Sequence, residues 1–208
     1  MSRLRVDTIP LWLKPFFLLW AWSTAMLSYA LLVVFRLLCR VQVEGREQLP
    51  AGSHIYTIWH ENLILYFICH LRYGEPYAWM NHPAWFMKPV HIVLRFMGLQ
   101  KLVLGSTGNN GKQAMERVAE WVQQGYHTLL ACDGPVGPYR DMKYGALQIS
   151  ERSGRPVVPI RFSCQPGWRW RGWDKKVIPF PLATITMAYQ PPIYVKQVDE
   201  RTKNAIAA

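Results

Sequence analysis

Acidic side chains and cysteines are scarce in this chain, and both scarcities narrow the classes of protein it can belong to. The 208 residues include 13 Asp and Glu against 24 Lys and Arg, which gives a formal net charge of +11. The 4 cysteines stand far apart and form no C-x-x-C pair, so a dense disulfide framework is excluded. This spacing predicts reduced, mostly buried thiols in a protein that faces the cytosol. The cysteines are Cys39, Cys69, Cys132 and Cys164.

Several catalytic signatures are also missing. The chain has no Walker A motif, no dinucleotide-binding fingerprint and no G-x-S-x-G nucleophile elbow. His60 and Glu61 begin the H-E-x-x-H pattern of zinc proteases, but Ile64 stands where the second histidine is required. The sequence therefore implies no metal site and no bound cofactor. No internal repeat and no linker divides the chain.

The positive charge favours an anionic partner, which nucleic acid, phospholipid head groups or a phosphorylated cofactor would all provide. Aromatic residues make up 13% of the chain and include 10 Trp and 10 Tyr. Trp and Tyr concentrate where one end of the side chain is apolar and the other is wet. Together with the apolar N-terminus described next, this composition favours a phospholipid membrane as the partner, and no nucleic acid is expected.

Residues 16–35 form a long run without a formally charged side chain. A run of about 20 residues is what a helix needs to cross the hydrocarbon core of a bilayer. It is too long for a signal peptide and ends at no small-residue cleavage site. Three interpretations stay open: a helix in one leaflet, a membrane span, or a helix buried in protein. Trp12, Trp20 and Trp22 suit an anchor at head-group level.

Predicted strands and helices alternate after this run, which indicates an α/β fold. We expect a mixed, mostly parallel sheet flanked by helices, with an N-terminal membrane-associated helix. Residues 1–40 would form that hydrophobic segment and residues 41–208 the α/β domain. Strands are predicted at 41–43, 53–59, 77–80, 102–104, 128–132, 156–162 and 183–189, helices at 62–71, 85–97, 112–124 and 145–152, and a frayed tail after 197.

Two of the predicted strands end in ionisable side chains. His60 follows the strand at 53–59, and Asp133 follows the strand at 128–132. Ligands and catalytic groups of α/β proteins gather at such strand ends. An imidazole beside a carboxylate makes a general base with its orienting partner, which predicts proton abstraction from a hydroxyl. The next candidate histidine is His82, for which a structural role in a turn is the alternative.

Two loops are candidates for anion binding. The loop 105–111 is rich in glycine and opens onto a predicted helix, where backbone N–H groups attract anions; a helix-capping loop is the alternative. The loop that begins at Asp133 is followed by Arg140 and Lys143, which suit a phosphate; a tight turn is the alternative. Residues 168–176 alternate aromatic and basic side chains, which indicates a lip touching anionic lipid or single-stranded nucleic acid.

The order of these features resembles the lysophospholipid (glycerolipid) acyltransferase superfamily, and more narrowly its small bacterial branch with a D-G-P-x-G-P block. The resemblance covers roughly residues 41–195. Trp59-His60 is similar to the W-H block of that branch, and Asp133-Gly134-Pro135 to its form of the E-G-T-R-S block. Gly105-Ser106 stands where the acceptor-binding block falls. Val43-Glu44-Gly45 with Leu49-Pro50 resembles the lead-in, and the stretch 156–159 the final block.

The resemblance implies an acyltransferase that moves a fatty acyl group from acyl-CoA or an acyl carrier protein to a hydroxyl of a lysophospholipid or related lipid. His60 would be the general base, oriented by Asp133 as first choice or Glu61 as second. Loop N–H groups near Gly105 or Gly134 would stabilise the oxyanion. The location implied is monotopic at the inner (cytoplasmic) membrane, with the catalytic domain facing the cytoplasm. Expected substrate-binding residues are Gly105, Ser106, Thr107, Gly134, Pro135, Arg140 and Lys143.

The chain also departs from the family pattern. Leu65 stands five positions after His60, where the superfamily carries the Asp of its H-x-x-x-x-D motif, and Val136 stands where an Arg would help bind phosphate. The stretch 80–83 lacks the acidic residues of this branch. Two alternatives therefore stay open: a non-catalytic lipid-binding relative, and a lipid hydrolase or thioesterase with a similar His–Asp pair.

Overall fold

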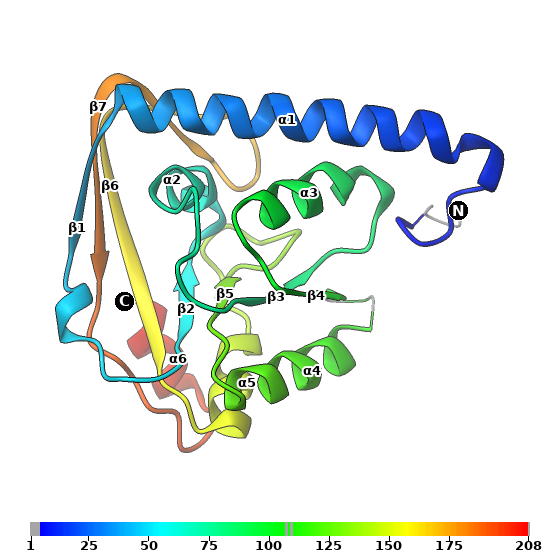
Figure 1. Cartoon of the computed structure of the whole chain (residues 1–208). Helices are drawn as coiled ribbons and strands as arrows, with labels where there is room; N and C mark the ends of the chain where they lie inside the picture. Colours follow the sequence, from blue (N-terminus) through cyan, green and yellow to red (C-terminus); the bar gives the residue numbers. More distant parts are fainter. Residues whose placement is uncertain (1–4, 107, 109, 208) are drawn as a thin grey trace.

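The protein, described here from a computed structural model over residues 5–106, 108 and 110–207, is built around a central sheet (Figure 1). In this part of the chain five strands pair in the order β1-β7-β6-β2-β5. A second, two-stranded parallel sheet, β3 and β4, lies beside β5, where an isolated bridge joins Tyr77 and His127, the residues just before β3 and β5. The strands are β1 (Arg40–Glu44), β2 (Ile55–Ile58), β3 (Ala78–Asn81), β4 (Lys101–Leu104), β5 (Thr128–Ala131), β6 (Val157–Arg169) and β7 (Val177–Tyr189).

The predicted α/β class with a mixed, mostly parallel sheet is confirmed. β2 runs parallel to both of its neighbours, β5 and β6, and β1 runs parallel to β7. β6 and β7 form a long antiparallel hairpin. The β2 strand is buried at every position, which explains why its sequence reads as a continuous apolar run rather than an alternating one.

Helices cover both faces of the sheet (Figure 1). One face carries α2 and α3, and an apolar cluster that includes Tyr66, Leu94 and Met97 fills the space beneath them. The other face carries α4 and α5 over a second cluster that includes Val118 and Leu147. These helices are α2 (Leu63–Cys69), which follows the 3-10 turn η3 (His60–Asn62), α3 (Lys88–Phe96), which follows η4 (Trp85–Met87), α4 (Gly111–Gln123) and α5 (Gly145–Ser153).

The N-terminal apolar run forms one long helix, α1 (Lys14–Leu38), preceded by the short turn η1 (Leu11–Leu13). Its inner side packs on α2 and α3, where Ala21 and Ala25 are fully buried. The outer side of α1, together with η1, carries large exposed apolar residues: Leu11, Trp12, Phe16, Leu19, Met26, Leu27, Leu31 and Leu37. Of the helices in the described residues, the stretch Leu11–Leu38 is long and apolar enough to cross a membrane. It lies along the surface of the domain (Figure 1).

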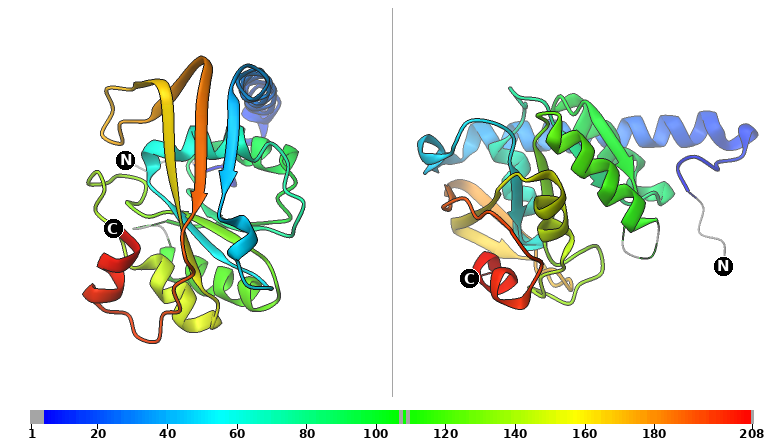
Figure 2. Two further views of the ribbon diagram at one scale, coloured as in Figure 1. Left: turned by 90° about the vertical axis from the view of Figure 1, so that its left-hand side faces the viewer. Right: turned by 90° about the horizontal axis from the view of Figure 1, so that it is seen from below.

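The β6–β7 hairpin is longer than predicted on both strands. The sequence predicts strands at 156–162 and 183–189, but pairing continues out to Arg169 and Val177. Prolines interrupt both extensions, at Pro166, Pro179 and Pro181, so the local pattern did not read as strand. The basic aromatic residues 168–176 therefore form the tip of this hairpin. The tip and α1 lie at the same end of the sheet (Figure 2). Near that end, Cys39 Sγ, just after α1, lies 3.6 Å from the carbonyl oxygen of Phe180 on β7.

The prediction of a frayed C-terminal tail is wrong. Residues 200–207 form helix α6 (Glu200–Ala207), and Ile206 is buried in the cluster beneath α4 and α5. The guanidinium of Arg161 on β6 donates to the carbonyl oxygens of Ile206 and Ala207 at 3.4 and 3.3 Å. One apolar side chain in a polar segment is too weak a pattern to predict this docking from the sequence.

Candidate active site

The two predicted strand-end residues meet. β2 and β5 are adjacent and in parallel register, with Ile58 opposite Ala131, so the residues that follow each strand emerge side by side. His60 Nδ1 lies 2.9 Å from Asp133 Oδ1, and the backbone N–H of His60 donates to the same oxygen at 3.1 Å. The Asp133 side chain is fully buried and that of His60 is 18% exposed.

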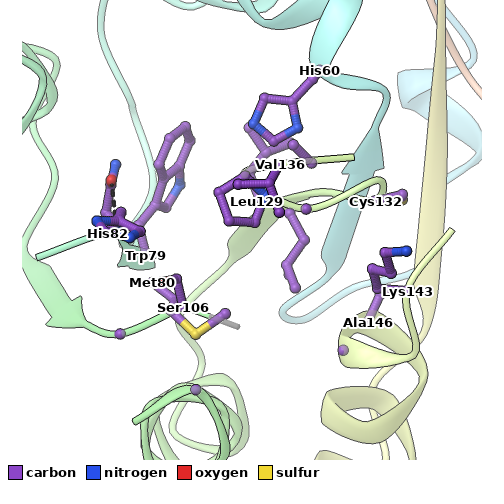
Figure 3. Close-up of a pocket in the computed structure, with 18 of the residues that line it drawn as sticks. His60, Trp79, Met80, His82, Ser106, Leu129, Cys132, Val136, Lys143 and Ala146 are labelled. Carbon is purple, nitrogen blue, oxygen red and sulfur yellow. Dashed lines mark hydrogen bonds between the residues drawn. The ribbon is translucent and has the colours of Figure 1, made fainter. Parts of the chain in front are cut away.

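These contacts assign the tautomer of the imidazole. Because the Asp133 carboxylate is an acceptor, His60 Nδ1 carries the proton and donates it. In the neutral ring Nε2 then has a free lone pair, which is the form a general base needs. Figure 3 shows the His60 ring at the end of β2, pointing into a cavity that Trp79 and His82 line from the opposite side. The arrangement therefore presents a proton acceptor to whatever occupies the cavity.

The cavity is large and has an apolar side. Its volume is about 1260 Å³, which is enough for a lipid chain and part of a head group. The apolar side lies beneath the N-terminal half of α1, where the ring centroids of Trp20 and Trp85 are 5.3 Å apart. The apolar residues that line it are Leu63, Phe67, Trp79, Trp85, Phe86, Met87 and Val90.

The opposite side of the cavity is cationic, with side chains contributed by α4, α5, α6, the hairpin tip and the loop before α5. The Lys143 ammonium is 2.5 Å from Asp141 Oδ2, and both side chains are partly exposed. Asp141 and Asp174 also line this side and pair with Lys143 and Lys176, so the basic side chains outnumber the acidic ones. The remaining positive charge attracts phosphate or carboxylate groups of a ligand. The basic residues on this side are Lys112, Lys143, Arg152, Lys176 and Lys203.

Most of the predicted substrate-binding residues line this cavity: Gly105, Ser106, Gly134, Pro135 and Lys143. Thr107 lies outside the described residues. At the start of α4 the chain needs glycine, because a Cβ on Gly111 would stand 2.7 Å from the Ser106 carbonyl oxygen. This close approach holds the start of α4 against Ser106 at the cavity wall.

The backbone amides of Gly105 and Gly134 both donate to backbone carbonyl groups. The Gly105 N–H donates to the Asn81 carbonyl at 2.9 Å, which continues the β3–β4 ladder. The Gly134 N–H donates to the Ala131 carbonyl at 3.2 Å and closes the turn after β5. Local backbone pairing therefore uses these two amides, and the expectation that loop N–H groups near Gly105 or Gly134 stabilise an oxyanion stays a prediction for the neighbouring amides.

Glu61 and Arg140 are not among the residues that line the cavity, although each is adjacent in sequence to one that is, and they pair with each other. Arg140 Nε donates to Glu61 Oε1 at 3.0 Å, and Arg169 and Tyr139 donate to Oε2, each at 2.6 Å. Burial alone would raise the pKa of the Glu61 carboxyl, but these three donors outweigh it and hold the pKa below its usual value. In the described residues Asp133, not Glu61, contacts the imidazole. The Arg140 side chain stays 51% exposed beside Glu61, and its expected phosphate contact remains a prediction.

One aromatic neighbour of His60 was missed from the sequence. The ring centroid of Trp173, at the hairpin tip, is 5.3 Å from that of the imidazole. Gly137 makes room for it, since a Cβ there would stand 2.7 Å from the Trp173 ring. The aromatic strip at 168–176 was the available signal, but only the fold of the hairpin places Trp173 over the catalytic candidate.

Comparisons with known proteins support the fold. No protein-family model matches the chain. An uncharacterized protein of Rickettsia prowazekii (strain Madrid E) is 28% identical over 150 residues, which cover 72% of this chain and 67% of that protein. The crystal structure of the 1-acyl-sn-glycerophosphate (LPA) acyltransferase PlsC from Thermotoga maritima superposes with a TM-score of 0.55 at 15% identity, covering 90% of this chain and 75% of that one. The chain therefore has the fold of that acyltransferase.

Proposed function

We propose that the protein is a membrane-associated acyltransferase that moves a fatty acyl group from a thioester donor, acyl-CoA or an acyl carrier protein, to a hydroxyl of a lysophospholipid or related lipid. The observation that carries this proposal is the His60–Asp133 pair at the edge of a cavity with one apolar and one cationic side. The apolar side suits an acyl chain, and the cationic side suits a phosphate of the donor or the acceptor. The fold shared with an acyltransferase supports it.

The chemistry follows from the assigned tautomer. His60 Nε2 takes the proton of the acceptor hydroxyl as its oxygen attacks the thioester carbonyl carbon. The imidazolium that forms donates from Nδ1 to Asp133, which stabilises the charge and keeps the ring oriented. The tetrahedral intermediate then collapses, the carbon–sulfur bond breaks, and the leaving thiolate recovers the proton from Nε2. One ester forms, one thiol is released, and His60 returns to its neutral form.

We place α1 and the hairpin tip at the membrane interface. The outer side of α1 exposes large apolar residues along its length, and at the tip Trp168 and Trp170 are half-exposed beside arginines. A soluble monomer rarely exposes so extended an apolar surface. Because α1 packs sideways on α2 and α3, the proposal is a monotopic helix in one leaflet, which brings the apolar side of the cavity next to the lipid tails.

The function is tested with the purified full-length protein, acyl-CoA or acyl carrier protein as donor, and a panel of lysophospholipids as acceptors. Mass spectrometry of the products and assay of the released thiol are expected to show an acceptor-dependent new ester in equal amount. Release of free fatty acid without acceptor would instead indicate a thioesterase. Lipid binding without thiol release from any donor would indicate a non-catalytic relative.

Membrane attachment is tested on the outer side of α1. Leu27 and Leu31 are exposed and one helical turn apart, so replacing both with Glu leaves the core intact. We expect the double variant to lose most of its binding to neutral vesicles, and its residual binding to anionic vesicles to fall steeply with salt. Vesicle co-sedimentation measures both.

The matched control adds the same charge elsewhere. Gln113 and Gln124 are exposed on or just after α4, and replacing both with Glu should leave binding unchanged. Wild-type binding by the Leu27→Glu, Leu31→Glu variant would show that α1 is not the membrane contact.

A further inference from the structure

Glu61 is a buried carboxylate next to the proposed base, and the chemistry above does not use it. Its side chain is 1% exposed. Its two oxygens accept hydrogen bonds from Tyr139, Arg140 and Arg169, which belong to the loop after β5 and to the end of β6. One carboxylate therefore ties together three segments that are distant in the sequence.

Glu61, Tyr139, Arg140 and Arg169 form a cluster in which the Glu61 carboxylate is buried and the two guanidinium groups are exposed. The side chains of Arg140 and Arg169 are 51% and 57% exposed, so water solvates them when they are released. A buried carboxylate has no such alternative and must keep its donors. Removal of the Glu61 charge is therefore expected to free both arginines, whereas loss of one arginine leaves the other donors in place.

The cluster reaches the His60–Asp133 pair through the backbone of Arg140. The N–H of Arg140 donates to Asp133 Oδ2 at 3.4 Å, while Oδ1 accepts from His60. Arg140 has φ +55°, a left-handed conformation that is unfavourable for a residue with a side chain unless its surroundings hold it. The guanidinium contact with Glu61 holds Arg140 in this conformation and so keeps its N–H at the carboxylate.

Arg169, the second arginine of the cluster, connects Glu61 to the hairpin tip on the other side of His60. Arg169 precedes the hairpin tip that carries Trp173, and the Trp173 ring packs against the imidazole. By holding Arg169, Glu61 fixes the base of the tip. The imidazole thus lies between the Asp133 loop and the hairpin tip. Glu61 connects both of these elements to η3, the turn that also carries His60.

We propose that Glu61 is a positioning residue: through Arg140 and Arg169 it holds the Asp133 loop and the Trp173 tip around His60, and so sets the His60–Asp133 hydrogen bond. Its effect on turnover rests on the proposed acyl transfer, whereas its effect on the hydrogen bond does not. A misplacement of a catalytic group by about 1 Å costs on the order of a hundredfold in rate.

The test uses the full-length protein in detergent and two readouts. The first is the proton resonance of His60 Nδ1–H, which a hydrogen bond to a carboxylate moves downfield and which is assigned by its loss in His60→Ala. The second is the split between kcat and KM. Glu61→Gln keeps the shape and removes the charge. Glu120→Gln is the matched control, because Glu120 is ion-paired with Arg117 on the exposed side of α4.

We expect Glu61→Gln to shift or broaden this resonance and to lower kcat about a hundredfold with little change in KM. Arg140→Gln and Arg169→Gln, each of which leaves Glu61 partnered, should give smaller changes in the same direction and serve as the test if Glu61→Gln does not fold. Glu120→Gln should match the wild type in both readouts.

Glu61→Gln with a lower melting temperature but the wild-type resonance and wild-type kcat would overturn the proposal and make the cluster purely structural. If the wild type transfers no acyl group, the proposed function fails, and the resonance alone decides whether Glu61 positions the pair.

Discussion

Strands β2 and β5 bring ionisable residues together at both of their ends. His54 and His127 precede the two strands, and His60 and Asp133 follow them, with the same register between the strands. At the first end the His54 N–H donates to His127 Nδ1 at 3.1 Å, and at the second the imidazole of His60 contacts Asp133 at 2.9 Å. The same backbone pairing thus produces two polar pairs that differ in partner and in access.

The pair His54 and His127, at the N-terminal ends of β2 and β5, is closed to solvent. Both rings are buried and stack at 5.3 Å between centroids, with the Tyr56 ring 5.6 Å from His127. Burial lowers the pKa of His127 to about 4, so the ring is neutral; Nδ1 accepts from His54, and Nε2 lies 3.3 Å from Glu75. Neither histidine lines the large cavity. The role of this pair is therefore to fill the space at the N-terminal ends of β2 and β5.

The difference shows what a strand-end histidine needs in order to act as a base. A buried carboxylate must hold one nitrogen, and the other nitrogen must open on a space that a substrate can enter. His60 meets both conditions and His127 meets neither. The following predictions test this contrast, beginning with the largest expected effect.

Replacing Asp133 with Asn is expected to give the largest loss. The amide keeps the shape but lets its NH2 group donate to Nδ1, which places the proton on Nε2 and removes the base. A comparable change in a Ser-His-Asp enzyme lowers kcat by a factor on the order of 10⁴. Steady-state kinetics of the purified variant should show this loss with KM nearly unchanged. A decrease of less than tenfold would mean that Asp133 does not set the tautomer.

Replacing His127 with Phe should alter stability and spare turnover. The variant loses the acceptor for the His54 N–H, and an unsatisfied buried donor costs about 1–3 kcal/mol. Urea unfolding should show a decrease of that size in the free energy of unfolding, with wild-type kcat per folded molecule. If kcat instead falls as far as in Asp133→Asn, the two ends of the strands are not functionally distinct.

Acid should destabilise the fold through its buried histidines. An unfolded histidine has a pKa of about 6.5, whereas burial lowers the pKa of His70, His91 and His127 to about 4. Between these values the unfolded chain binds more protons, so the free energy of unfolding is greatest above pH 6.5 and falls as the pH drops toward 4. Urea titrations at several pH values should show a shallower slope for His127→Phe. An unchanged slope would mean that His127 does not resist protonation.

The sequence predicts the two strands, the residues that end them and the class of fold. Continuous apolar runs stop at His60 and Asp133, and the alternation of strands and helices indicates a mostly parallel sheet. The sequence does not predict that β2 and β5 are neighbours, so the contact between His60 and Asp133 follows from the topology of the sheet. The same topology makes His54 and His127 meet, although neither carries a local signal.

The contact partners of Glu61 and Arg140 could not be predicted from the sequence. Glu61 stands beside His60, and Arg140 stands close behind Asp133, so local spacing suggested an orienting carboxylate and a phosphate contact. Glu61 instead meets Arg169, which is 108 residues away and reaches it only because the β6–β7 hairpin extends so far. Helix α6 was missed for a similar reason, since only tertiary packing reveals its single buried isoleucine.

The most direct test of the account is the rate of acyl transfer by purified His60→Ala beside the wild type and His127→Phe. Loss of a general base costs about a hundredfold to ten-thousandfold in rate. The account predicts a loss of this size for His60→Ala, with folding and membrane binding intact, and wild-type turnover for His127→Phe. Near-normal turnover by His60→Ala would contradict it.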